Sequence, residues 1–359
     1  MADFNGFQMV GVCRFSVLST DFTTQRRGTP EEIAERIFQP AAMELRFKLF
    51  EALTWATLSA QTDPDFKLVI LTSEEMPKRY LDRLRDVTAS HPGTEVWAAP
   101  IDRHYKLLRM SFDRVAPDGS GHRLSFRIDD DDAVDLEMVQ RAKSIARRLV
   151  DFQRDEVPSI LCWNKGFYFD LNAEGESQLT DTFLRAPLAI GNTLIHRPGD
   201  GHNPYRYNHK NFAAHYNVYS DISLPGFIRS VHPGNTSTPQ LEPRRGEMAE
   251  GRVTRQIKRH FGLDADALRR ALTALQQHPH RPRRPAGETD EIGAQRLEFR
   301  QRYLRRRPTL VEIETRVELH QVLVAQFTLR QQHHRRGRAR LLARLDLDIG
   351  DIDLTADDR

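Results

Sequence analysis

Cysteine is scarce in this chain: its 359 residues include only Cys13 and Cys162. Two cysteines so far apart, without metal-type spacing, exclude a disulfide framework and a cysteine-based zinc cluster. Long apolar runs are also missing, because no stretch reaches the roughly 18 to 20 residues that a membrane-spanning helix needs. The first residues lack the charged, apolar and small-residue regions of a signal peptide. These absences predict a cytoplasmic protein whose membrane contact, if it has one, is peripheral.

Charge of one sign is not in large excess over the whole chain, but it is unevenly distributed. The net charge is +3, whereas residues 244–340 hold 23 Lys and Arg against 11 Asp and Glu, a local charge of +12. The remaining residues therefore carry −9. An acidic body with a basic arm indicates an anionic partner for the arm, such as phospholipid headgroups, lipid-linked phosphate or nucleic acid.

Strand-like and helix-like segments alternate in the first hundred residues. Short β-branched and aromatic runs predict the strands, and apolar residues at helical spacing predict the helices, the first of which starts at the capping sequence Thr29-Pro30-Glu31-Glu32. Such alternation predicts an α/β fold with a mainly parallel central sheet, in which ligands bind at the carboxyl ends of the strands. The predicted order is strand 7–18, helix 30–60, strand 66–71, helix 77–89 and strand 95–99.

Later segments continue this pattern up to about residue 235. The polar segment 199–219, rich in His and Asn, has the composition of an active-site loop. An apolar run at 187–195 precedes it. The other predicted elements are a strand at 124–128, a helix at 135–152 and a hairpin of strands at 157–163 and 166–171.

The amino-acid composition of the chain changes beyond residue 236. A Thr- and Pro-rich linker is followed by charged helical patterns at 250–275 and 290–345, and the chain ends in an acidic segment. We therefore predict three parts, namely an α/β domain at 1–240, a basic helical extension at 241–345 and an acidic flexible tail at 346–359.

Four consecutive aspartates, Asp129–Asp132, directly follow the predicted strand 124–128. Carboxylates this close repel one another and destabilise a fold unless cations neutralise them. Hard oxygen ligands suit Mg²⁺ or Mn²⁺, and alternation along an extended chain would place Asp129 and Asp131 on one side. The alternative is a solvated acidic turn that favours the dipole of a following helix. The position after a buried strand favours the metal site.

Three stretches resemble a known family: CRFSVL at 13–18, LFEALTWATLSAQTDPDFKLVILTSEEMP at 49–77 and FRIDDDDAV at 126–134. They look like the bacterial rhamnosyltransferase family, which belongs with the GT-A glycosyltransferases, and the similarity spans roughly residues 8 to 235. The resemblance implies a GT-A-like nucleotide-diphospho-sugar transferase fold. It also implies Mn²⁺ or Mg²⁺ as the cofactor that bridges the donor diphosphate.

The resemblance further implies which residues bind metal and donor. Asp129 and Asp131 match the metal and ribose-phosphate pair, Asp132 is adjacent, and His232 stands where such enzymes bring a histidine to the metal. Arg127 is expected to pair with the aspartates or with the diphosphate. Candidates for the contact with the nucleobase and ribose are Arg14, Ser16, Thr72 and Ser73.

Sugar transfer with inversion also needs a base for the acceptor hydroxyl, and carboxylates or histidines can serve. The polar segment and its end supply Asp200, His209 and Asp221 as candidates, with His215 beside them. The sequence does not choose among these residues.

These observations predict a metal-dependent glycosyltransferase that uses a dTDP- or UDP-sugar, with rhamnose as the sugar implied by the resemblance. The acceptor would be a glycan or a lipid-linked saccharide, and the basic arm could pack on the enzyme, join a second subunit or contact the inner membrane. Two alternatives stay open, a nucleic-acid-binding protein acting through its Arg-rich arm and a metal-dependent phosphohydrolase. The first is less favoured because the chain shows no recognised readout motif for nucleic acid.

Overall fold

The computed structural model of the chain describes residues 6–22, 28–152, 157–171, 177–232, 235 and 248–277. All of them belong to the first of two units of the chain, Met1–Asp290. The predicted helix at 290–345 and the acidic tail at 346–359 lie outside the described residues.

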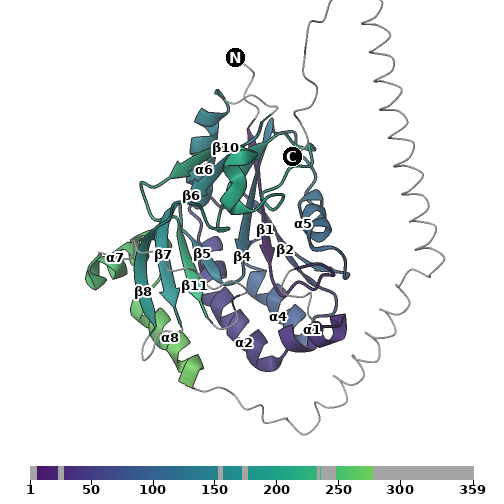
Figure 1. Cartoon of the computed structure of the whole chain (residues 1–359), viewed down its shortest axis with the longest axis vertical. Coiled ribbons are helices and arrows are strands. Elements are labelled where there is room, and N and C mark those ends of the chain that lie inside the picture. The colour runs from purple at the N-terminus through teal and green to yellow at the C-terminus, as the bar shows by residue number, and fades with distance from the viewer. Residues whose placement is uncertain are drawn as a thin grey trace, which may run out of the picture. The chain divides into compact units, whose positions relative to one another are not determined.

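Seven of the described strands form the main sheet. They are β1 (Phe7–Arg14), β2 (Lys67–Ser73), β3 (Thr94–Ala99), β4 (His122–Asp129), β6 (Ser159–Trp163), β9 (Thr193–His196) and β10 (Asn217–Asp221). Their order is β10-β6-β9-β4-β1-β2-β3 (Figure 1). Strand β9 runs antiparallel to β4 and β6, and the other neighbouring pairs are parallel. The predicted α/β fold with a mainly parallel sheet is therefore confirmed.

A second sheet contains β5 (Asp132–Val134), β7 (Lys165–Asp170), β8 (Gln178–Phe183) and β11 (Phe227–Val231), in the order β5-β11-β7-β8. The predicted hairpin of 157–163 with 166–171 is wrong, because β6 belongs to the main sheet and β7 to the second one. Only Asn164 separates the two strands, which is too short for a hairpin loop. Strand β7 pairs instead with β8 and β11, which come later in the chain.

The predicted helix at 30–60 is divided into α1 (Pro30–Ile37), α2 (Pro40–Leu49), the π-helical turn η2 (Phe50–Trp55) and α3 (Ala56–Leu58). Pro40 ends the continuity, because it has no amide hydrogen to donate within a helix. The predicted helix start is confirmed, since Thr29 and Glu32 form a reciprocal capping box at 3.3 Å and 2.8 Å.

The remaining helices cover the sheets. They are α4 (Lys78–Thr88), α5 (His104–Asp113), α6 (Met138–Leu149), the 3₁₀ helix η3 (His209–Ala214), α7 (Glu250–Phe261) and α8 (Ala265–Gln277). Helix α5 packs Leu107, Leu108 and Phe112 against the valines of β1 and β2.

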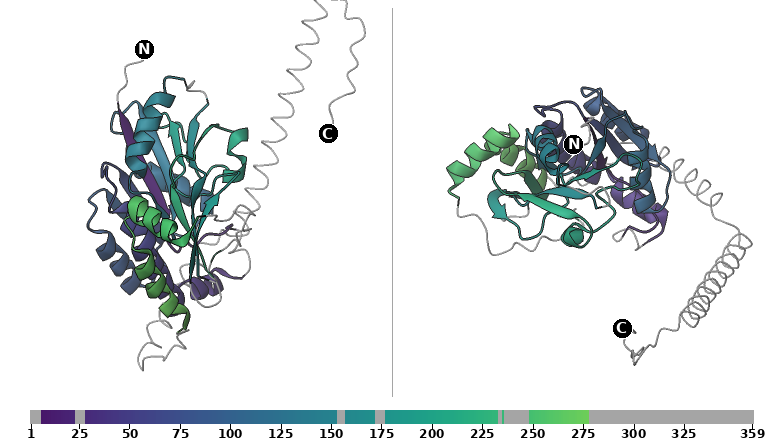
Figure 2. Two further views of the ribbon diagram at one scale, coloured as in Figure 1. Left: turned by 90° about the vertical axis from the view of Figure 1, so that its left-hand side faces the viewer. Right: turned by 90° about the horizontal axis from the view of Figure 1, so that it is seen from above.

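Helices α7 and α8 lie against the second sheet (Figure 2). Val253, Ile257 and Phe261 of α7 share a hydrophobic cluster with Phe167 of β7 and Ile228 of β11. Leu268 and Leu272 of α8 extend the same cluster. Burial of these apolar side chains holds 250–277 on the α/β core.

The sheet core gives a stability prediction at Gly11 of β1. A Cβ atom there would lie 2.1 Å from Cζ of the buried Phe126 on β4, so Gly11→Ala overpacks the core. We expect the free energy of unfolding, measured with urea, to fall by about 2 kcal/mol or more. Gly251→Ala in α7 is the matched control, because its Cβ would lie 3.7 Å from Arg255 Nη1, an ordinary contact, and alanine favours a helix by up to about 1 kcal/mol. Equal losses in both variants would contradict the packing argument.

Candidate functional site

The four aspartates form the turn between β4 and β5, at the edge where β1, β2 and β4 all end. Asp129 is the last residue of β4 and is paired in register with Arg14, the last residue of β1. This is the carboxyl edge of the parallel strands, where ligands of α/β sheets bind. The predicted position of the acidic run after a buried strand is confirmed.

Each aspartate of the run meets its own basic or polar partner. Arg14 binds both carboxylate oxygens of Asp129, at 2.8 Å and 2.6 Å. Arg46 of α2 lies 3.1 Å from Asp130. The chain itself therefore relieves much of the repulsion, so repulsion alone does not require a metal ion.

The other two aspartates face the second sheet and the residues after it. His232 Nε2 lies 3.0 Å from Asp131 Oδ2, and the Asn235 side-chain amide donates to the same oxygen at 2.8 Å. Asp132 is buried and senses the positive charge of Arg229 on β11. Strand β11 and the residues after it thus close the far side of the acidic turn.

Burial and charge act in opposite directions on these carboxylates. Burial by itself raises the pKa of Asp129, but the Arg14 guanidinium more than compensates, so the net pKa lies below its ordinary value. Burial raises the pKa of Asp130 to about 6, although Arg46 opposes it. Burial and the charge of Asp131 raise the pKa of Asp132 well above its ordinary value. Asp129 is therefore the most strongly held anion of these three.

Asp131 Oδ2 and His232 Nε2 lie at an ordinary hydrogen-bond distance, which is also the spacing of two adjacent ligands of an octahedral ion. Two ligands about 2.1 Å from an octahedral ion, at right angles, are about 3.0 Å apart. The observed 3.0 Å between Oδ2 and Nε2 fits this spacing. Within the described ranges, no group of three or more His, Cys, Asp or Glu side chains could hold a metal ion. A metal here would need further ligands from substrate phosphates or water, as Mg²⁺ commonly does.

Arg14 connects the acidic turn to the start of α5. Its Nη1 lies 3.2 Å from Nε2 of His104, and its guanidinium lies over the rings of Phe22 and Tyr205, at 5.4 Å and 5.6 Å from their centres. Burial and the charge of Arg14 lower the pKa of His104 to about 4, so this histidine is neutral near pH 7. The Arg14 side chain is thus positioned by Asp129, by His104 and by two aromatic rings.

Arg127 lies on the same face of β4 as Asp129, two residues earlier. It forms no ion pair with the aspartates in the described part of the chain. Its Nη1 donates to the Pro204 carbonyl at 3.1 Å, its guanidinium covers the Tyr205 ring at 4.3 Å, and its Nε has no hydrogen-bond partner there. The expected pairing with the aspartates is thus not observed.

Tyr205 fixes the polar segment to the strands. Its hydroxyl donates to the Val12 carbonyl of β1 at 3.0 Å, and its ring lies under both Arg14 and Arg127. The residues after it lead to η3, which starts at His209. The tyrosine therefore sets where the 203–209 segment crosses the carboxyl edge.

The structure separates the three candidate bases. Asp200 accepts a hydrogen bond from Nδ1 of His196 at 2.8 Å, and His196 pairs in register with Arg123. Arg123 precedes Asp129 by six residues of β4, which is about 20 Å of strand. Asp200 thus lies toward the amino half of the sheet, away from the acidic turn.

A Ser-His-Asp chain occurs at this place, because Ser125 Oγ lies 2.8 Å from His196 Nε2. The Ser125 side chain is completely buried within β4, so a substrate cannot reach its oxygen. A nucleophilic serine must be accessible to its substrate. The chain of hydrogen bonds is therefore structural and does not indicate a hydrolase.

The other two candidate bases, Asp221 and His209, also lie at different distances from the acidic turn. Asp221, at the end of β10, forms an ion pair with Arg141 at 2.5 Å. Strand β10 lies three strand spacings, about 14 Å, from β4. His209 senses the charges of Arg127, Arg229 and Asp129, and mainly burial lowers its pKa to about 4. His209 is therefore near enough to the acidic turn to sense the charge of Asp129.

The candidates for nucleobase contact are buried at the ends of β1 and β2. Thr72 and Ser73 take part in a turn, where Ser73 Oγ accepts from the Glu75 amide at 3.1 Å. Ser16 has a left-handed backbone, φ 52°, and its hydroxyl points to Met43 Sδ at 3.6 Å. A non-glycine residue in this region is strained, and such strain is concentrated at functional sites.

Sequence reasoning missed five residues that contact or surround the acidic turn, namely Arg46, Thr54, His104, Arg229 and Asn235. Thr54 lies within the stretch 49–77 that carries the family resemblance, and Asn235 follows His232 by three residues. These two positions in the sequence could have indicated that Thr54 and Asn235 belong to the site. Arg46 and His104 have no local signal, because only the packing of α2 and α5 brings them to the site.

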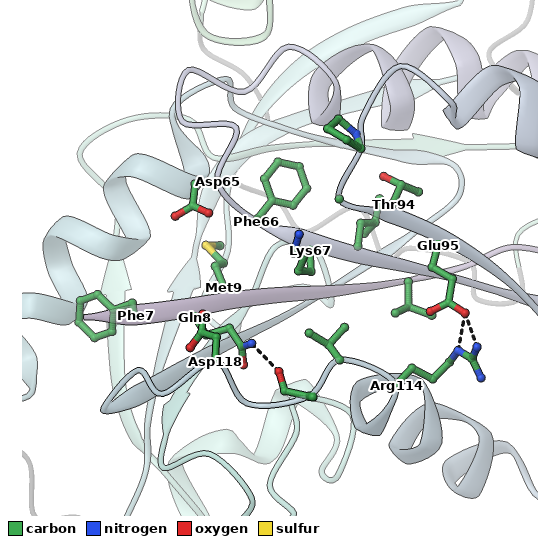
Figure 3. A pocket seen from close by; sticks show the side chains of 16 residues that line it. Phe7, Gln8, Met9, Asp65, Phe66, Lys67, Thr94, Glu95, Arg114 and Asp118 are labelled. Atoms are coloured by element: carbon green, nitrogen blue, oxygen red, sulfur yellow. Dashed lines mark hydrogen bonds and ion pairs between the residues drawn. The ribbon is translucent and has the colours of Figure 1, made fainter. Parts of the chain in front are cut away.

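A cavity of about 450 Å³ lies at the opposite edge of the main sheet, at the amino ends of β1, β2 and β3 (Figure 3). Phe7, Met9, Lys67 and the ion pair of Arg114 with Glu95 line it. None of the four aspartates belongs to its lining, so the cavity is separate from the acidic turn.

In a mainly parallel α/β sheet, ligands bind at the carboxyl edge of the strands, which is where the acidic turn lies. Residues 8–244, well over half of the chain, match the family described as "Putative rhamnosyl transferase". The chain belongs to this family. The predicted family and the predicted α/β class are thus confirmed, and the family match favours neither the nucleic-acid-binding nor the phosphohydrolase alternative.

Two solved structures are similar to this chain at low identity. One is S. aureus TarS 1–349, with 11% identity, a TM-score of 0.36 and coverage of 62% of this chain and 60% of that chain. The other is the same protein in complex with UDP, with 11% identity, a TM-score of 0.33 and coverage of 63% and 61%. The chain thus spans about three fifths of these proteins. No curated protein matches it.

Helices capable of crossing a lipid bilayer were not found in the ranges that the structure describes.

The His196–Asp200 contact gives a pH-dependent prediction. Burial alone raises the pKa of Asp200, but the hydrogen bonds from His196 and the His202 amide lower it below its ordinary value. A depressed carboxylate pKa stabilises the fold above the unfolded pKa of about 3.9, and this contribution is lost as the pH falls through the folded pKa. We expect Asp200→Asn to lower the free energy of unfolding by about 1 to 2 kcal/mol at pH 7.

Urea unfolding at pH 7 and at pH 3 checks this prediction. The difference between Asp200→Asn and the unchanged chain should shrink toward zero at pH 3, and Asp151→Asn at an exposed position should show no difference at either pH. A loss of the same size at both values would show that the carboxylate charge is not responsible.

Proposed function

We propose that this glycosyltransferase transfers a sugar, with rhamnose as the first candidate, from a nucleotide-diphosphate donor to a glycan or lipid-linked acceptor. The observation that carries the proposal is the Asp131–His232 pair at the carboxyl edge of the sheet, in a chain of the rhamnosyl transferase family. Asp131 and His232 would hold Mn²⁺ or Mg²⁺, which would neutralise charge on the departing diphosphate. Asp129 and the buried Asp132 would shape the site beside them.

The charges of the site support joint binding of metal and donor. Four arginines, Arg14, Arg46, Arg127 and Arg229, stand around the four aspartates and balance them. A donor diphosphate adds about two negative charges, and a divalent cation offsets them. We therefore infer that each ligand raises the affinity for the other, because thermodynamic coupling is reciprocal.

Two of these arginines, Arg14 and Arg127, would bind the donor. Arg14 ends β1, next to the strained Ser16, and Arg127 lies beneath the 203–209 segment with one N–H unpaired. Both cations suit the phosphates and ribose of a nucleotide. Thr72 and Ser73 would then support the end of β2 from within the turn.

His209 would act as the base toward the acceptor hydroxyl. Its low pKa leaves the ring neutral, and the negative charge of a bound diphosphate would raise that pKa toward the working range of a base. Asp200 and Asp221 hold structural partners elsewhere. The predicted peripheral membrane contact belongs to the basic extension 241–345, of which the structure describes residues 248–277, and it stays a proposal.

Calorimetry of UDP and dTDP binding, with and without Mn²⁺, tests the proposed site. We expect nucleotide binding that requires Mn²⁺, disappears with EDTA and is weakened at least about 100-fold by Asp131→Ala. Mn²⁺ alone should bind at least about tenfold more weakly than in the presence of nucleotide. Asp151→Ala, at an exposed position, is the control and should bind normally. Binding of neither nucleotide under any condition would refute the donor assignment.

Steady-state kinetics tests the proposed base. His209→Gln should lower kcat by about 10² to 10⁴, with KM for the donor changed by only a few-fold, because the ring acts after the donor is bound. Asp200→Asn and Asp221→Asn should retain most of kcat, since both lie away from the acidic turn. A larger loss of kcat in either aspartate variant than in His209→Gln would reverse the assignment.

A further inference from the structure

The π-helical turn η2 touches the backbone of the acidic turn through one hydroxyl. Thr54 Oγ1 donates a hydrogen bond to the Asp132 carbonyl at 2.7 Å and lies 3.3 Å from the Asp129 carbonyl. These two carbonyls are at the two ends of the four-residue run. The hydroxyl therefore fixes the separation of the ends, and with it the directions in which the side chains of Asp130 and Asp131 leave the backbone.

The same helical segment continues this contact along the chain after the run. Thr57 Oγ1 accepts from the Val134 amide at 3.3 Å. The Gln61 side chain donates to the Asp135 carbonyl at 2.8 Å and accepts from the Val139 amide at 3.0 Å. These side chains are buried, so their polar groups are satisfied by the 129–139 backbone and not by water.

The π-helical turn explains why a polar stripe can face the aspartates. In an uninterrupted α-helix, spacings of three and four residues would place the apolar and the polar residues of this segment on one face. A π turn holds one extra residue and rotates the following residues by roughly 100°. This separates the apolar stripe, Met43, Phe47 and Phe50, from the polar stripe, Thr54, Thr57 and Gln61.

The two stripes have different partners. Phe47 and Phe50 pack on Phe15, just past the end of β1, with ring centres 5.0 Å and 5.2 Å apart. Thr54 instead meets the acidic turn, and Arg46 of the same segment reaches Asp130. The segment thus connects the end of β1 to the end of β4, the two strand ends that carry Arg14 and Asp129.

We propose that Thr54 is a positioning residue for donor binding, and that η2 exists to aim its hydroxyl at the acidic turn. This rests on the proposed function. Thr54 is completely buried and cannot itself touch a ligand, so it acts through the shape of the run Asp129–Asp132. Loss of its hydroxyl lets the two ends of the run move apart and misdirects Asp131.

The test replaces the hydroxyl by a methyl group of similar size, in Thr54→Val. The matched control is Thr88→Val in α4, because Thr88 is also buried and its hydroxyl also donates to a main-chain carbonyl, in this case that of Leu84 in the same helix at 2.8 Å. We expect Thr54→Val to weaken binding of UDP or dTDP with Mn²⁺ by about tenfold, and Thr88→Val to change it less than about twofold. Thr54→Ser should restore binding.

Hydrogen–deuterium exchange of residues 129–135 provides a readout that does not depend on the ligand. Exchange there should be faster in Thr54→Val than in Thr88→Val, and normal in Thr54→Ser. Equal exchange and equal nucleotide affinity in the two valine variants would overturn the proposal. If the unchanged chain binds neither nucleotide, the proposed function fails, while the exchange comparison still decides whether Thr54 positions the run.

Discussion

Four adjacent carboxylates can coexist at the end of a buried strand because positive or polar groups from separate elements meet them. Arg14 comes from β1, Arg46 from α2, Arg229 from β11 and His232 from the residue after β11. Without these partners the carboxylates would repel one another in a region of low dielectric. The acidic turn is thus complete only when both sheets and the α2 segment are in place, so the integrity of the site depends on the whole fold.

Two backbone-directed contacts give this electrostatic arrangement its geometry. The Tyr205 hydroxyl donates to the Val12 carbonyl and holds the 203–209 segment next to Arg14 and Arg127. Thr54 binds the carbonyl at the far end of the acidic run from the opposite side. In both cases a side-chain hydroxyl donates to a main-chain carbonyl, at 3.0 Å from Tyr205 and at 2.7 Å from Thr54. Opposite charge determines which side chains pair with the aspartates, and the Tyr205 and Thr54 hydrogen bonds fix where the paired segments lie.

Much of the fold follows from local pattern. The alternation of strands and helices, the capped helix start at Thr29 and the strand before Asp129 were all predicted, because each depends on neighbouring residues. The supposed hairpin at 157–171 was wrong, since the sequence shows strand character but not which sheet a strand joins. Likewise, the helix at 30–60 was predicted as one piece, although Pro40 interrupts it.

The sequence by itself determined that four aspartates end a buried strand, that the chain belongs with sugar transferases, and that a basic arm follows an acidic body. The tertiary structure alone decided which basic or polar group meets each aspartate, and that Asp200 and Asp221 lie away from the acidic turn while His209 senses the charge of Asp129. Strand register and sheet order set these distances. Both arise from packing between residues far apart in the chain, which no local spacing encodes.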